Sequence, residues 1–215
     1  GNSKYGVLVG NSSTSSSSGR LLSLTNADTS NNGSQTNGYD GIVLNSSTTT
    51  DPVVLTNITS TYNGGNGIWI LQSGTVTITN SDFSHNYNVS APTVYYGGLR
   101  IDNAGVMVNL NNVSSNSNHK TGMHVRHGTV NVNGTADKNT YNENTSYGVY
   151  VSHDDARLSL NNATIYKNSG ISGVRVEDGT AVITGSSITA NSIGVGATKT
   201  LAGSVNIQST QITGN

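Results

Sequence analysis

Residues 67–86 read GIWILQSGTVTITNSDFSHN and contain the three parts of a unit that recurs along the chain. The unit opens with Gly, an apolar residue, any residue and a second apolar residue, as in residues 67–70. A second alternating segment follows, with Val76 and Ile78 on one face, and the unit ends on Asn86. Alternation with a period of two residues indicates β-strands, and self-similarity along a chain indicates a repeat architecture.

The opening and closing residues of the unit recur together. Most of the opening motifs are about 25 residues apart. They begin at Gly6, Gly41, Gly67, Gly98, Gly122, Gly148 and Gly173, with a degenerate eighth copy at Gly194. The closing residue lies eight positions after the second apolar residue of the second segment, as Asn86 does after Ile78. It is Asn in seven units: Asn32, Asn63, Asn86, Asn118, Asn168, Asn191 and Asn215. The fifth unit has Thr140 at this offset, so we expect its turn to be built differently.

Three short strands joined by turns wind naturally into a coil. The backbone groups of each coil must pair with the coils above and below, at a spacing of about 4.8 Å. The sequence therefore predicts an all-β fold, a single-stranded parallel β-helix of about eight rungs with three short strands per rung, as one domain over residues 1–215. Asn at a fixed turn position tolerates left-handed backbone angles, and stacked amides can form an asparagine ladder.

The repeated strand, the second apolar pair and the closing Asn resemble the right-handed parallel β-helix, the pectin-lyase-like solenoid. Residues 83–86, Phe-Ser-His-Asn, are similar to the Phe-x-x-Asn repeats of autotransporter-type surface proteins. The resemblance implies a right-handed coil. It leaves the function open, because polysaccharide lyases, glycoside hydrolases, phage tailspikes and surface adhesins share this architecture.

Composition excludes several classes of function. The chain has 215 residues, a net charge of −1, no Cys, 33% hydrophobic residues and only 10% charged residues. An average domain has about 45–50% apolar and about 25% charged residues. No basic stripe is available for nucleic acid, and no apolar run approaches the roughly 18 residues of a membrane span. Without Cys there is neither a disulfide nor a thiolate metal site.

Strand alternation places two columns of side chains on the outer face of the first strands. These columns collect most of the unusual residues, and we take eight as candidate ligand-binding residues: Trp69, Arg100, Asp102, His124, Arg126, Tyr150, Arg175 and Glu177. Their aromatic rings would stack on sugars and their guanidinium groups would pair with carboxylate or sulfate. The alternative is a plain surface of compensating ion pairs, each worth less than about 1 kcal/mol.

Catalysis would require an acid or base beside the bound sugar, in addition to residues that bind it. A lyase needs a base and a cation beside it, and the candidates are His124, Arg126, Asp154 and Asp155. A hydrolase needs two carboxylates roughly 5–10 Å apart. The chain has no Asn-Thr-Asp, Gly-His-Gly or Asp-Pro-His motif of the polygalacturonase or epimerase type. We expect no cofactor and no metal, apart from Ca²⁺ if the site is lyase-like, and we expect His85 and His119 to be solvated in turns.

Nine sequons for N-glycosylation occur, which is close to the roughly eight that chance predicts. They are Asn11, Asn32, Asn45, Asn57, Asn88, Asn112, Asn133, Asn144 and Asn162. Three of them share one repeat position just after the second strand: Asn57, Asn112 and Asn162.

The leading hypothesis is an extracellular or cell-surface structural solenoid, a stalk, adhesin or filament segment that is glycosylated and contacts a polysaccharide or a cell-surface glycan. It rests on the low charge, the Ser, Thr and Asn content and the missing catalytic motifs. No cap is visible, so we expect a segment of a longer β-helix whose bare ends associate. The alternative is a carbohydrate-active enzyme, a polysaccharide lyase or glycoside hydrolase, or a tailspike, that acts through the Arg, His and Trp residues.

Overall fold

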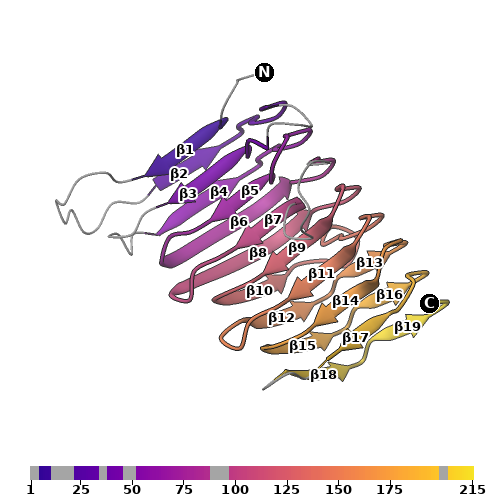
Figure 1. The fold of residues 1–215 in the computed structure, drawn as a ribbon. Helices are drawn as coiled ribbons and strands as arrows, with labels where there is room; N and C mark the ends of the chain where they lie inside the picture. Colours follow the sequence, from indigo (N-terminus) through magenta and orange to yellow (C-terminus); the bar gives the residue numbers. More distant parts are fainter. Residues whose placement is uncertain (1–4, 11–21, 34–37, 46–51, 88–96, 199–202) are drawn as a thin grey trace.

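The computed structural model describes residues 5–10, 22–33, 38–45, 52–87, 97–198 and 203–215. In these residues the chain forms strands and no helix, so no helical element there could cross a bilayer. The strands coil into an elongated solenoid with the two termini at opposite ends (Figure 1). All strand pairs in the described ranges are parallel, which confirms the predicted all-β parallel solenoid.

Two large sheets and one small sheet form the walls of the solenoid. The first sheet contains the strands of the Gly-apolar-x-apolar motif, in chain order β1 (Val7–Gly10), β3 (Ile42–Asn45), β5 (Ile68–Ile70), β7 (Gly97–Ile101), β9 (Thr121–Val125), β11 (Tyr147–Val151), β14 (Ser172–Val176) and β17 (Val195–Ala197). The second sheet contains β2 (Leu22–Thr25), β4 (Val53–Thr56), β6 (Gly74–Asp82), β8 (Val106–Ser114), β10 (Thr129–Asn133), β12 (Arg157–Asn161), β15 (Thr180–Thr184) and β18 (Ser204–Gln208).

The third sheet is less regular than predicted. It contains only β13 (Thr164–Tyr166), β16 (Ser187–Thr189) and β19 (Gln211–Thr213). Before β13, isolated bridges such as Thr140 to Thr164, and the far ends of β6 and β8, continue this wall. The prediction of eight rungs of three strands each is therefore slightly off, because in several coils of the described residues the third strand is reduced to a single bridge.

The core lies inside the coil and consists of the predicted apolar pairs. Ile68 and Ile70 of β5, and Val76 and Ile78 of β6, are fully buried. The in-register pairing stacks like residues, as where Ile68 lies beside Leu99. A solenoid needs only these inward columns, which explains how 33% hydrophobic residues suffice.

An asparagine ladder runs along the corner between the third and first sheets. In each step the backbone N–H of one Asn donates to the side-chain oxygen of the next, as where Asn63 donates to Asn86 at 3.0 Å. The side-chain amide donates to the same oxygen in most steps, but that of Asn86 donates to the carbonyls of Ser60 and Phe83. The fifth unit has a different turn, as predicted, because residues 135–138 form an extra turn of their own. Asn144 takes the place in the ladder, because four extra residues, 135–138, move it beyond the usual offset. The ladder is thus unbroken from Asn32 to Asn215.

Candidate functional site

The predicted outer column of the first sheet exists and is in register. Its members pair in sequence across the sheet: Leu8, Val43, Trp69, Arg100, His124, Tyr150, Arg175 and Gly196. Because parallel in-register strands stack equivalent residues, a one-dimensional repeat becomes a column of side chains. The outer column of the second sheet consists mainly of Asn, Ser, Thr and Val, with Asn109 and Asn131 stacked at its centre.

In the outer column of the first sheet, neighbouring side chains stack on the aromatic rings and cover most of them. The Arg100 guanidinium lies 4.8 Å from the centre of the Trp69 ring, which is half-buried. The rings of His124 and Tyr150 stack with centres 4.8 Å apart, and Tyr147 stacks on Tyr150 at the same distance. His124 is 0% exposed and Tyr150 only 4%. His124 and Tyr150, two of the predicted ligand-binding residues, are therefore covered by neighbouring side chains.

Burial also changes the chemistry of His124. Its own burial, and then the positive charges of Arg100 and Arg126, lower the pKa of His124 to about 3. Its Nε2 atom lies 2.7 Å from the Ser152 hydroxyl oxygen. A buried imidazole that stays neutral down to about pH 3 is a weak base that a polymer cannot reach, so His124 is a poor candidate for a catalytic base.

The charged candidates of the first sheet pair with one another. Asp102 binds Arg100 at 2.7 Å and Arg126 at 3.0 Å. Glu177 accepts a hydrogen bond from the Tyr150 hydroxyl at 2.6 Å, and its other oxygen lies 3.7 Å from Arg175. The side chains of Asp102 and Arg100 are only 7% and 11% exposed, whereas that of Arg126 is 46% exposed. Arg126 is thus the charged candidate of this sheet that solvent reaches best.

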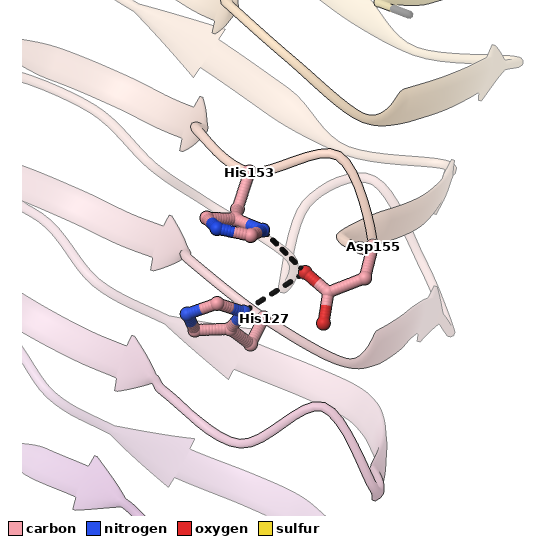
Figure 2. Close-up of side chains that lie close together, drawn as sticks. All are labelled: His127, His153 and Asp155. Atoms are coloured by element: carbon pink, nitrogen blue, oxygen red, sulfur yellow. Dashed lines mark hydrogen bonds and ion pairs between the residues drawn. The ribbon is translucent and has the colours of Figure 1, made fainter.

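A second cluster lies at the corner where the first sheet turns into the second. His127 belongs to the turn after β9, and His153, Asp154 and Asp155 belong to the turn after β11. The Nδ1 atoms of both histidines lie 2.8 Å from the same oxygen of Asp155 (Figure 2). The His153 Nδ1 atom is also 2.6 Å from the Asp154 carboxylate, whose side chain is 62% exposed.

The environment of Asp155 keeps it ionised. Burial by itself raises the pKa of Asp155, but the hydrogen bonds and charges of His127 and His153 outweigh it and lower the pKa below the usual value. The sequence places His127 and His153 on successive rungs, but only the stacked turns bring both rings to one carboxylate. Asp154 and Asp155, predicted as catalytic candidates, therefore lie beside the histidines of this corner and not in the ion pairs of Arg100 and Arg126.

A third feature, which the sequence did not predict, is an aromatic groove at the ladder corner. Tyr62 and His85 stack with ring centres 5.0 Å apart and planes 3° apart, and Tyr87 packs against His119 at 4.5 Å. Tyr62 is 60% exposed. The groove has a volume of about 470 Å³ and is also lined by Asn63 of the ladder. The predicted exposure of His85 is correct, although it is stacked and not freely solvated.

The asparagines of the predicted sequons differ in how far they are exposed to solvent. Asn45, Asn57, Asn133 and Asn162 are exposed, and Asn112 is half-buried. Asn32 and Asn144 are members of the ladder, 2% and 0% exposed, with their amides hydrogen bonded, so the folded chain has no room for a glycan on either. Asn11 and Asn88 lie outside the described residues.

Comparison with known proteins supports the architecture and no particular activity. Neither the comparison with curated proteins nor that with solved structures found a match. A family model described as the right handed beta helix region matches residues 1–181. The parallel solenoid and this match over most of the chain agree, and the chain therefore belongs to the right-handed β-helix family.

Proposed function

We propose that this chain is a structural β-solenoid of an extracellular or cell-surface assembly, a stalk, adhesin or filament segment. The observation that carries the proposal is the internal pairing of the first sheet: Asp102 is bound by two arginines, and Glu177 by Tyr150. A catalytic acid or base must reach its substrate, but His124 is buried. These polar side chains act as a ladder that holds the coils in register.

The low charge and the polar surface support an exposed location. Only 10% of residues are charged, and the outer face of the second sheet has mainly Asn, Ser, Thr and Val. Asn57 and Asn162 lie exposed at the same repeat position, so glycans there would stand in register along one edge.

The glycan contacts of such a surface protein belong in the aromatic groove at the ladder corner. Tyr62 and His85 have φ angles of 55° and 57°. A bulky residue is uncommon in this left-handed region and costs about 1–2 kcal/mol relative to an ordinary conformation. The same turn position is left-handed in other coils, as at Ser117 and Glu143, so the backbone angle belongs to the turn. What distinguishes these two coils is the exposed ring pair, and the apolar faces of sugar rings stack on such rings.

Replacing the aromatic residues of the groove should weaken glycan binding. We expect Tyr62→Ala and Tyr87→Ala each to weaken binding to a glycan from an array by about ten-fold or more, the loss typical of an aromatic anchor. Isothermal titration with the purified glycan measures the change. Arg126→Ala on the first sheet is the matched control and should leave the affinity unchanged. Loss of affinity with Arg126→Ala alone would contradict the placement in the groove.

The enzyme alternative has its own test. A polysaccharide lyase produces unsaturated ends, and a glycoside hydrolase produces new reducing ends. We expect neither when the intact chain is incubated with a panel of acidic and neutral polysaccharides. Turnover that disappears in Arg126→Ala would overturn the structural role, because this exposed cation is the one best placed to reach a substrate.

A further inference from the structure

The cluster of His127, His153 and Asp155 has the composition of a metal site. One nitrogen of each histidine and one oxygen of Asp155 all lie within 4.8 Å of one another. Figure 2 shows both rings directed at the same carboxylate oxygen from one side. The side chains are 20%, 48% and 37% exposed, so an ion from solvent can enter and the side chains can adjust.

Stacking of the coils creates this arrangement. The backbone N–H of Arg126 bonds to Ile101, and that of Ser152 bonds to Val125, so the residue after each of them occupies the same place in successive coils. These residues are His127 and His153, and their ring centres are only 4.1 Å apart. Two imidazoles held side by side at one carboxylate form a donor set that comes from two coils.

We propose that His127, His153 and Asp155 bind a divalent transition-metal ion of the Zn²⁺ type. Two imidazole nitrogens and one carboxylate oxygen suit zinc, copper or nickel, whereas Ca²⁺ and Mg²⁺ prefer sets of oxygen atoms alone. Three protein ligands leave further positions for water or for the adjacent Asp154.

Binding an ion requires the side chains to adjust, because the three donor atoms now lie within 4.8 Å of one another and not at one common spacing. Zinc binds nitrogen and oxygen at about 2.0–2.2 Å, so two tetrahedral ligand atoms stand about 3.3 Å apart. Each histidine nitrogen now lies 2.8 Å from the Asp155 oxygen. Half-exposed side chains in a turn can open by this difference without moving the strands.

A charged group behind His127 supports the site. Its Nε2 atom faces Asp102 at 4.0 Å, and Asp102 is held in place by Arg100 and Arg126. A carboxylate behind a metal-binding imidazole orients the ring and raises its basicity. The ion pairs of the first sheet thereby position one ligand. Because the ligands come from two coils, a bound ion would also tie these coils together.

Titration of the untagged full chain with ZnCl₂ tests the proposal. After treatment with a chelator, calorimetry should show saturable binding of about one ion per chain, because the part of the chain that the structure describes contains one such donor set. His127→Gln and His153→Gln should each weaken binding by about ten-fold or more, since each removes a direct ligand. His119→Gln, at the ladder corner, is the matched control and should change nothing.

Two further measurements keep the test decisive if a variant misfolds. In the unaltered chain, added Zn²⁺ should shift the imidazole NMR signals of His127 and His153 and leave the other three histidines unchanged. Zinc should also raise the melting temperature, and this rise should vanish in the double variant. No binding, binding that survives the double variant, tighter binding of Ca²⁺, or equal loss with His119→Gln would each overturn the proposal.

Discussion

Replacing Asn144 with alanine is expected to lower the free energy of unfolding by about 3–5 kcal/mol, a severe effect for one side chain. The Asn144 side chain accepts two hydrogen bonds from Asn118, at 2.9 and 3.0 Å, and donates to Asn168 and Ser115. All of these contacts are buried. Alanine would leave the buried backbone N–H of Asn118 without an acceptor and remove one of the two acceptors of its side-chain amide, which also donates to Ser115. The buried carbonyl of Ser115 would lose a donor as well, and each buried unsatisfied group costs about 1–3 kcal/mol.

Urea unfolding followed by circular dichroism measures the loss for Asn144→Ala. The matched control is Asn131→Ala, which removes a stacked amide that is only half-buried on the outer face of the second sheet. This control should cost less than about 1 kcal/mol. Equal losses for the two variants would contradict the assignment of Asn144 to the ladder.

Substituting Gly122 with alanine should destabilise the chain by about 3 kcal/mol or more, through overpacking. An added Cβ atom would lie 2.6 Å from the carbonyl oxygen of Gly148 and 2.9 Å from that of Ser115. Both are backbone atoms of a tightly stacked wall and cannot turn away. The same collision, with the next glycine carbonyl at 2.6–2.9 Å, recurs from Gly6 to Gly173 and explains why the motif always opens with glycine.

Thermal unfolding compares Gly122→Ala with Gly196→Ala. At Gly196 the nearest atom to an added Cβ is the end of the Arg175 side chain, 3.3 Å away, which can move. We expect a change within about 1 kcal/mol there. If Gly122→Ala were as stable as Gly196→Ala, the close approach of neighbouring coils could not be the reason why each motif opens with glycine.

Much of the fold was predictable because a parallel, in-register coil converts sequence spacing directly into position. Trp69 and Arg100 were predicted to be neighbours from their offsets alone, and they are. Asn144 was missed because four extra residues move it away from the expected offset. The motif itself was visible: residues 141–144, Tyr-Asn-Glu-Asn, match residues 83–86 in having an aromatic residue three places before Asn.

The candidate site was harder to predict than the fold. Alternation shows that His124 and Tyr150 face outward, but not that their rings lie on one another and exclude solvent. The aromatic groove depends on a turn position where the residue type varies from coil to coil, so no repeat marks it. His127 and His153 come together only because two turns of different length place both rings at Asp155.

The four extra residues of the fifth coil have a practical consequence. Residues 135–138 form a turn of their own, with the N–H groups of Lys138 and Asn139 both bonded to the Thr135 carbonyl, while the ladder continues through Asn144. Three of these residues, Thr135, Asp137 and Lys138, are exposed. This corner therefore accepts added chain without disturbing the stack, which makes it a natural place to graft a foreign peptide and display it on a rigid rod.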